Sequence, residues 1–144
     1  MADFTTQSPD RIIASWNNIN ITGYADDTFI EIERDEDGFT FMTGALGDTT
    51  RVRSLNRSGK VTFTLMALAP VNDLLADAAQ EDEDTGEGYG PLQIVDLNGT
   101  MLVSAANAWI SKRPKIERAR EATTVQWVLQ CADLVVFEGG GTLR

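Results

Sequence analysis

Residues 28–44 of this chain read TFIEIERDEDGFTFMTG, and the expected fold starts from them. Apolar and polar residues alternate on both sides of Asp37-Gly38. This dipeptide is favoured in two-residue hairpin turns, whose two central positions need positive φ. The pattern therefore predicts two antiparallel strands joined at Asp37-Gly38, with Arg34 facing Phe41 across the pair.

The predicted hairpin has one apolar face and one polar, mostly acidic face. The apolar side chains are Ile30, Ile32, Phe39 and Phe41. The polar side chains are Glu31, Glu33, Asp35 and Thr40. Residues 60–66, KVTFTLM, repeat the alternation as a third strand, with Thr62 and Thr64 on the polar side. The sequence thus predicts a sheet with a dry side and a wet side.

Further strands extend this sheet in both directions along the chain. They are predicted at residues 11–16, 19–22, 92–97, 100–110 and 123–137. Asn17-Asn18 is expected to form a turn, and Asn98-Gly99 is a strong hairpin signal. Because both faces of the 92–110 hairpin are largely apolar, that part of the sheet is expected to be covered on both sides.

One helix is predicted after Pro70. Asn72 is expected to cap it, and the helix continues to Ala79 or slightly beyond. Its apolar stripe consists of Leu74, Leu75, Ala78 and Ala79. Four carboxylates follow at residues 81–84, where they oppose the helix dipole. They fit either a solvated acidic loop or an electrostatic contact surface.

The chain is expected to form one domain over residues 1–144. Within it, residues 1–10 are expected to be an arm and residues 139–144 a flexible tail. Residues 45–59 show no regular pattern and contain Arg51, Arg53 and Arg57. A loop of this length inside a compact domain is uncommon and is usually functional or ordered by a partner.

Composition excludes several classes of function. With 42% hydrophobic and 24% charged residues, the chain has the composition of a soluble globular protein. No apolar run approaches the roughly 20 residues that span a bilayer, and the N-terminus does not resemble a secretory signal. The net charge of −10 argues against a protein that binds nucleic acid by neutralising phosphates.

The residues offer little for catalysis. The chain has no histidine, which removes the commonest general base and metal ligand. Residues 35–38, DEDG, lack the spacing and terminal glutamate of a calcium loop. Glu31 and Glu33 form a carboxylate pair, but any wet strand face gives this pattern. The residue types therefore predict that the chain is not an enzyme and that it has no catalytic residue, no cofactor and no metal.

The single cysteine and the three tryptophans are expected to be structural. Cys131 lies in an apolar strand pattern and is predicted to be a small buried hydrophobe. One cysteine also excludes an internal disulfide, which fits folding in a reducing cytoplasm. Trp16, Trp109 and Trp127 are expected to be anchors of the core or of a subunit interface.

Two oppositely charged segments indicate self-assembly. Residues 73–87 carry seven carboxylates and no cation, whereas residues 112–120 carry five cations. Opposed patches suit a head-to-tail contact, in which one surface meets a different surface of the next copy. If the rotation closes, sheets joined edge to edge form a ring. The acidic strand face would then line the hole, and DNA could slide through it.

Three runs of the chain together resemble the tail tube proteins of contractile-tailed bacteriophages. They are FIEIERDEDGFTFMTGALGDTTRVRSLNRSGKVTFTLMALAPVNDLL, GYGPLQIVDLNGTMLVSAANAWISKRPK and VQWVLQCADL, in that order. The resemblance implies a mainly β fold, an antiparallel β-sandwich or barrel with one flanking α-helix, assembling into hexameric rings. Such rings stack into the inner tube within a contractile sheath, and the negatively charged channel conducts the genome into the host.

The resemblance also implies partners and a location. The implied partners are further copies of the chain, the tail sheath protein, and the baseplate and tail terminator proteins. The tape measure protein and DNA pass through the lumen without specific binding, and no membrane partner is implied. The implied location is the virion tail, assembled in the bacterial host cytoplasm.

Two other functions stay open at this point. Tube proteins of type VI secretion and pyocin-like particles are similar in fold, so a related injection particle fits the sequence. A monomeric β-sandwich module that binds a sugar or a peptide on its acidic face is the alternative of a different class.

Two sets of site residues follow from the tube hypothesis. The channel-lining set is Glu31, Glu33, Asp35, Thr40, Thr62 and Thr64. The set for contacts between subunits and for stacking is Arg51, Arg53, Arg57, Asp73, Asp77, Glu81, Asp82, Glu83, Asp84, Lys112, Arg113, Lys115, Arg118 and Arg120. By the resemblance, residues 45–59 and the N-terminal arm contact adjacent rings.

Overall fold

The computed structural model of the chain describes residues 7–26 and 28–139. Of the predicted N-terminal arm (1–10) and C-terminal tail (139–144), residues 1–6 and 140–144 lie outside the described residues, and residues 9 and 10 begin a short 3₁₀ helix. In chain order the elements are η1 (Pro9–Arg11), β1 (Ile12–Trp16), β2 (Ile19–Asn20), β3 (Ile30–Arg34), β4 (Phe39–Thr43), β5 (Thr49–Arg53), β6 (Gly59–Met66), α1 (Val71–Thr85), β7 (Gly90–Asp96), β8 (Leu102–Lys112), β9 (Thr124–Cys131) and β10 (Leu134–Phe137). The predicted mainly β fold with one α-helix is confirmed.

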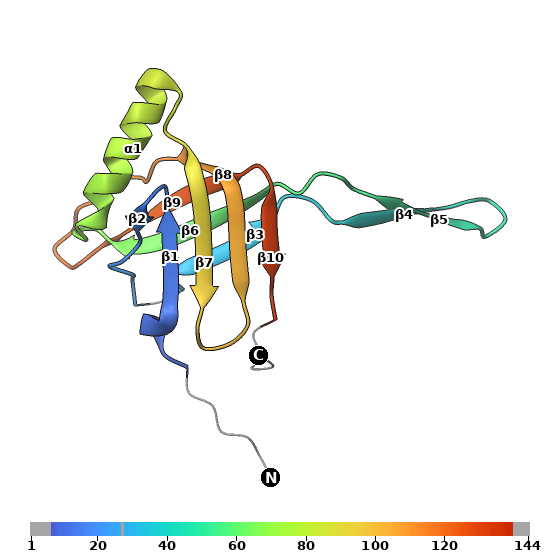
Figure 1. Cartoon of the computed structure of the whole chain (residues 1–144), viewed down its shortest axis with the longest axis horizontal. Coiled ribbons are helices and arrows are strands. Elements are labelled where there is room, and N and C mark those ends of the chain that lie inside the picture. The colour runs from blue at the N-terminus through green and yellow to red at the C-terminus, as the bar shows by residue number, and fades with distance from the viewer. Residues whose placement is uncertain (1–6, 27, 140–144) are drawn as a thin grey trace, which may run out of the picture.

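Eight of the strands form one antiparallel sheet that folds over into two layers. Its order is β2-β1-β7-β8-β9-β6-β3, and β10 pairs with β8 beside this path. β8 joins the layers, because its residues 102–105 pair with β10 and its residues 108–112 pair with β9. Figure 1 shows β1, β7 and β10 crossing in front of β3 and β6.

The core lies between the two layers. In β6 the side chains of Val61, Phe63 and Leu65 are fully buried, which confirms the predicted alternation. Trp16 and Leu129 are buried against them from the other strands. Each fully buried side chain of this size stabilises the fold by about 1.5–3 kcal/mol relative to its exposed state.

The helix begins one residue before the predicted cap. Pro70 is the N-cap, and Asn72 lies inside α1. The Asn72 amide donates to Met66 O at 2.9 Å and Ala67 O at 3.1 Å, and its Oδ1 accepts from Trp127 Nε1 at 3.0 Å. The prediction of Asn72 as a cap is therefore wrong, because its side chain is used to tie the helix to the sheet.

The buried stripe of α1 also differs by one residue. It consists of Val71, Leu75, Ala78 and Ala79, whereas Leu74 is half exposed. The predicted acidic residues 81–84 form the last helical turn before Gly86, which ends the helix with φ 75°. No helix in the described part of the chain is long and apolar enough to cross a membrane.

The predicted hairpin of residues 28–44 is wrong. β3 pairs with β6, so that Ile30 faces Phe63 and Ile32 faces Val61. β4 pairs with β5 instead, and Phe41 faces Arg51 rather than Arg34. Packing explains the position of β3, because Ile30 and Ile32 pack against the core beside β6. β4 instead runs out into solvent, where it pairs only with the equally exposed β5.

The Asp37-Gly38 dipeptide does not form the turn. Gly38 has no positive φ, and its carbonyl accepts from Ser54 N at 2.8 Å as the β4–β5 ladder continues. The turn lies at residues 44–48, where Gly47 has φ 93° and Gly44 N donates to Asp48 O at 2.7 Å. Residues 45–59 are therefore not an irregular loop, since β5 lies within them.

The other predicted turns are confirmed. Asn17 and Asn18 have φ of 50° and 67° and join β1 to β2. Asn98-Gly99 joins β7 to β8. The predicted strand at residues 123–137 is two strands, since β9 ends at Cys131 and β10 begins at Leu134. The β7–β8 hairpin is not covered on both sides in one copy, because Leu97 is 56% exposed.

Candidate functional site

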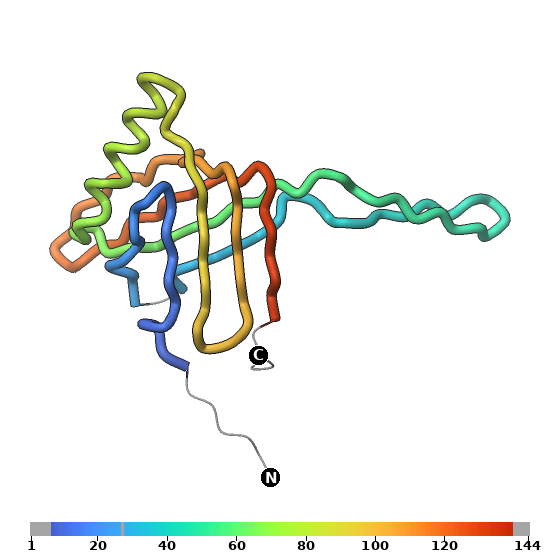
Figure 2. The backbone as a smooth tube through the Cα atoms, viewed as in Figure 1, coloured from blue at the N-terminus to red at the C-terminus, as the bar shows by residue number. Residues whose placement is uncertain are grey.

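A two-stranded arm projects from the body of the molecule. We define the arm as residues 36–57, which comprise β4, β5 and the turn between them (Figures 1 and 2). Every residue of β4 and β5 is exposed, and Phe41 and Leu46 are 75% and 93% exposed. A two-stranded ribbon is marginal by itself in water. The arm thus holds apolar surface that one copy leaves uncovered.

The predicted stacking arginines lie at different places on the arm. Arg51 and Arg53 are on β5, and the Arg51 guanidinium lies over the Phe39 ring, 4.3 Å from its centroid. Arg57 lies at the base, where its carbonyl accepts from Leu134 N at 2.9 Å. The arm therefore presents cations beside aromatic surface along β5.

Hydrogen bonds fix the base of the arm. Asp35 Oδ2 accepts from Gln130 Nε2 and from Ser58 Oγ, both at 2.8 Å. These two bonds hold the pKa of Asp35 below its usual value of 3.8, with a smaller effect from the Lys60 ammonium. We call Asp35, Ser58 and Gln130 the arm root.

The second side of the base is tied to β10. Arg34 Nη2 donates to Leu134 O at 2.8 Å, and Leu134 N donates to Arg57 O. Both chain segments that enter the arm are thereby bonded to the sheet. These bonds set the direction in which the arm leaves the body.

Four of the predicted channel-lining residues lie together. Cross-strand pairing sets Glu31 opposite Thr62 and Glu33 opposite Lys60. A polar hollow of about 360 Å³ is lined by these two pairs together with Asp35, so that Lys60 joins the four predicted residues Glu31, Glu33, Asp35 and Thr62. We call the outer side of β3 and β6 the polar face. It carries one cation among its carboxylates.

The other two predicted channel residues do not line this hollow. Thr64 follows Thr62 on the same side of β6 and is half-buried. Thr40 lies on β4, out on the arm, and not on the polar face. The displacement of Thr40 follows from the missed strand pairing.

The two charged segments contact each other within one copy. Arg113 Nη1 lies 3.2 Å from Glu83 Oε1 in the last turn of α1. The two side chains are 42% and 55% exposed, so the pair stabilises the fold by at most about 1 kcal/mol. Lys115 pairs locally with Glu117 at 2.9 Å.

The remaining predicted contact residues are exposed, except Asp82, which is half-buried. Lys112 ends β8, and Arg118 and Arg120 lie in the connection to β9. On α1 the further carboxylates are Asp73, Asp77, Glu81, Asp82 and Asp84.

A groove that the sequence analysis missed lies where β6 turns into α1. Residues 66–70, 118–119 and 121–123 line it together with Gly23, and its volume is about 380 Å³. Met66 and Leu68 are 51% and 88% exposed there. We call it the corner groove. The sequence signal for this groove is the run MALAP at residues 66–70. It stays apolar after the strand ends and up to Pro70.

The tryptophans and the cysteine occupy structural positions. Trp16 and Trp127 are buried in the core, whereas Trp109 is half-buried beside a hollow that Tyr89 and Asp82 also line. Burial raises the pKa of the Cys131 thiol to about 11, with a smaller effect from Asp35. The prediction that Cys131 is buried is confirmed. Among the described residues, no cluster of acidic and cysteine side chains suits a metal ion.

Solved structures with the same fold belong to contractile injection systems. A chain of the anti-feeding prophage cap, described as the AFP tube terminating cap, superposes with a TM-score of 0.66 at 11% identity, over 95% of this chain and 94% of that chain. A chain of the sheath/tube terminator of the extracellular contractile injection system PVC gives 0.64 at 14% identity, over 94% and 99%. A chain of the PVC sheath-tube complex gives 0.62 at 12% identity, over 92% and 91%.

Sequence comparison adds a relative and a family. Structural protein ORF10 of Pseudomonas phage KPP10 is 27% identical over 129 residues, which are 88% of this chain and 75% of that protein. The family described as Bacteriophage PhiTE tail tube protein matches residues 14–139. That match covers most of both sheet layers, α1 and the whole arm. The chain therefore belongs to the bacteriophage PhiTE tail tube protein family.

Proposed function

We propose that this chain is the subunit of the inner tail tube of a contractile-tailed phage, in which hexameric rings stack into a channel. The arm carries this proposal most directly. It is a fully exposed ribbon whose base is fixed by the arm root and by Leu134. A rigid base and an apolar, uncovered end suit a segment that is completed by another copy.

In the proposed ring, the sheets of neighbouring copies join edge to edge. β3 ends the strand order of the sheet, and its outer edge has no partner strand in the described part of the chain. An edge strand with free N–H and C=O groups pairs readily with another chain. Ring closure would satisfy these groups and leave the polar face directed to the channel.

The chemistry of the polar face suits passage of DNA. Glu31 and Glu33 are exposed carboxylates on β3, and they repel phosphates. Lys60 lies between β3 carboxylates and the Gln130 amide, which reduces its attraction for a phosphate. A channel with this lining conducts the genome and the tape measure protein without holding either of them.

The remaining partners are proposed from the family and from the similar structures. The sheath protein would surround the tube, the terminator protein would cap it, and the baseplate would nucleate it. Subunits would assemble in the host cytoplasm and end in the virion tail. Because the fold likeness extends to an extracellular contractile injection system, a tube subunit of a related phage-like injection particle is the second candidate.

A charge reversal tests the channel. Tubes assembled from the purified wild-type chain are expected to retain duplex DNA only at the background level of the assay. Glu31→Lys/Glu33→Lys tubes are expected to retain at least about tenfold more DNA than this background at low salt, and added salt should release it. The measurement is co-sedimentation of labelled DNA with tubes, with Glu31→Gln/Glu33→Gln expected to give an intermediate result.

The matched control places the same charge change elsewhere. Asp133→Lys/Glu138→Lys alters two exposed carboxylates on either side of β10, away from the polar face. Equal DNA retention by this control and by Glu31→Lys/Glu33→Lys tubes would contradict the channel assignment. If the purified wild-type chain forms neither rings nor tubes, the proposed function itself is wrong.

A further inference from the structure

We propose that the tip of the arm of one copy docks in the corner groove of the next copy, with Leu46 on its apolar floor and Asp48 beside Arg118. This inference rests on the proposed function, because it requires that copies assemble. It assigns a receptor surface for the arm and an ion pair at that surface.

The corner groove offers apolar surface that its own chain leaves open. Ala67, Ala69 and Pro70 give it an apolar lining, and Leu68 in the same lining is 88% exposed. Isolated exposed apolar side chains are common, but a concave group of them marks a binding surface. Arg118 and Glu121 add charges to the lining.

The arm tip has a matching size and chemistry. The turn at residues 44–48 is narrow, because Gly44 N and Gly47 N donate within it. Leu46 is 93% exposed at this turn, and Asp48 lies two residues further along the chain. One leucine with a carboxylate two residues away suits an apolar groove that has an arginine in its lining.

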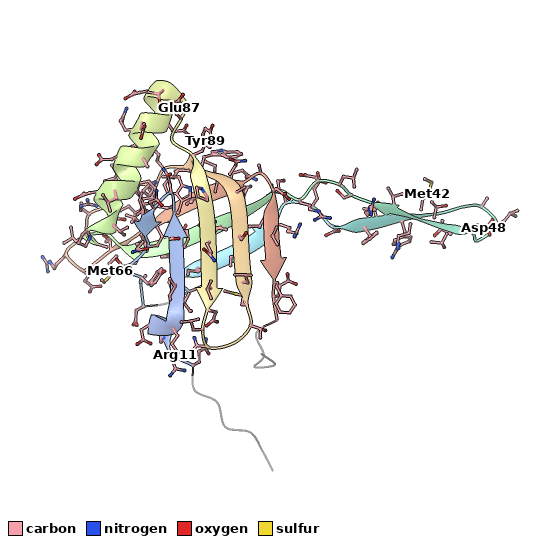
Figure 3. All side chains as sticks on the ribbon, viewed as in Figure 1. Arg11, Met42, Asp48, Met66, Glu87 and Tyr89 are labelled. Atoms are coloured by element: carbon pink, nitrogen blue, oxygen red, sulfur yellow. The ribbon has the colours of Figure 1, made fainter. Side chains whose placement is uncertain are left out.

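The two surfaces lie at opposite ends of one strand. β6 begins at Gly59 beside the arm root and ends at Met66 in the corner groove. Figure 3 shows Met66 on one side of the body and Asp48 at the far end of the arm on the other. A copy therefore cannot fill its own groove, and head-to-tail docking repeats along a series of copies.

Charge favours this groove over the other open hollow. In the described part of the chain, neither Asp48 nor Arg118 has an ion-pair partner. Each hollow has one carboxylate, Glu121 in the corner groove and Asp82 beside Tyr89 and Trp109, but of the two only the corner groove also has a cation, Arg118. Docking in the corner groove instead gives both unpaired charges a partner of opposite sign.

Cysteine cross-linking tests the docking directly. The variant Leu46→Cys/Leu68→Cys changes two exposed side chains, and the native Cys131 is buried, so neither change disturbs the core. Mild oxidation of assembled tubes is expected to give dimers and higher species on a non-reducing gel. The control Leu46→Cys/Val135→Cys places the second thiol on β10, where no cross-link above that of single-cysteine variants is expected.

The outcomes separate this inference from the proposed function. Tubes that form normally without a 46–68 cross-link would overturn the docking and leave the tube function intact. Cross-linking at Val135 in place of Leu68 would overturn it as well. A wild-type chain that forms no rings or tubes would remove the proposed function, and the docking with it.

Charge reversal gives a second readout. Asp48→Arg and Arg118→Asp are each expected to lower the yield of tubes at least about threefold. The combination Asp48→Arg/Arg118→Asp restores the pair in the opposite sense and is expected to recover most of that yield. Additive losses in the double variant would contradict contact between the two residues.

Discussion

Asp35 joins three separate parts of the chain through one carboxylate oxygen. Its Oδ2 accepts from Ser58 at the base of the arm and from Gln130 on β9. Gln130 Nε2 also donates to Gly59 O at 3.1 Å, so the same amide holds the first residue of β6. The orientation of the arm therefore depends on a few side-chain bonds at its base.

At this scale we expect Asp35→Ala to loosen the base of the arm without unfolding the sheet. Both side-chain bonds to Oδ2 are lost, so amides at Asp35 and Leu134 are expected to exchange with solvent about threefold faster or more. Hydrogen exchange followed by mass spectrometry measures this. Asp37→Ala is the control, and equal effects from both variants would contradict the role of Asp35.

The same bonds give the arm root a defined pH dependence. The folded-state pKa of Asp35 lies below 3.8, so its stabilisation is complete above that pH and is lost as the pH falls through the lowered pKa. The other charged groups that line the same hollow are Lys60, Glu31 and Glu33. We therefore expect faster exchange at the arm root only at pH values clearly below 3.8. Asp35→Asn, which keeps the shape without the charge, should abolish that step.

At the scale of the element, sequence reasoning found strands but not all of their partners. The alternation in β3 and β6 predicts which side chains face the core, and that part is confirmed. The predicted pairing failed at Asp37-Gly38, because Gly38 does not take the positive φ of that turn and β4 pairs with β5 instead. Bonds such as Gln130 to Asp35, which are 95 residues apart, have no local signal in the sequence.

The arm as an element is expected to act in assembly and not in folding. Arg51→Glu/Arg53→Glu changes only exposed positions, so the monomer is expected to keep its unfolding temperature within about 2 °C. Tube yield is expected to fall about tenfold, because these cations lie on the surface offered to the next copy. Light scattering and negative-stain micrographs measure the yield.

The control for this prediction conserves the charge. Arg51→Lys/Arg53→Lys keeps two cations on β5 and is expected to assemble close to the wild-type level. Tubes of normal length and yield from the glutamate variant would show that the β5 arginines are not at an assembly contact.

At the scale of the whole molecule, the mainly β fold with one helix followed from the sequence. The order of strands also places Glu31, Glu33 and Thr62 together, as expected from alternation within β3 and β6. The arm and the corner groove did not follow, because both depend on how distant segments meet. Because they lie at opposite ends of β6, the molecule has two different ends. A subunit with two different ends suits a head-to-tail assembly.

The most direct measurement is a cryo-electron microscopy map of the purified chain after assembly at high concentration. We expect stacked hexameric rings in which the polar face, with Glu31 and Glu33, lines the lumen. Single subunits at every concentration, or a tube with these two carboxylates on its outer wall, would contradict it.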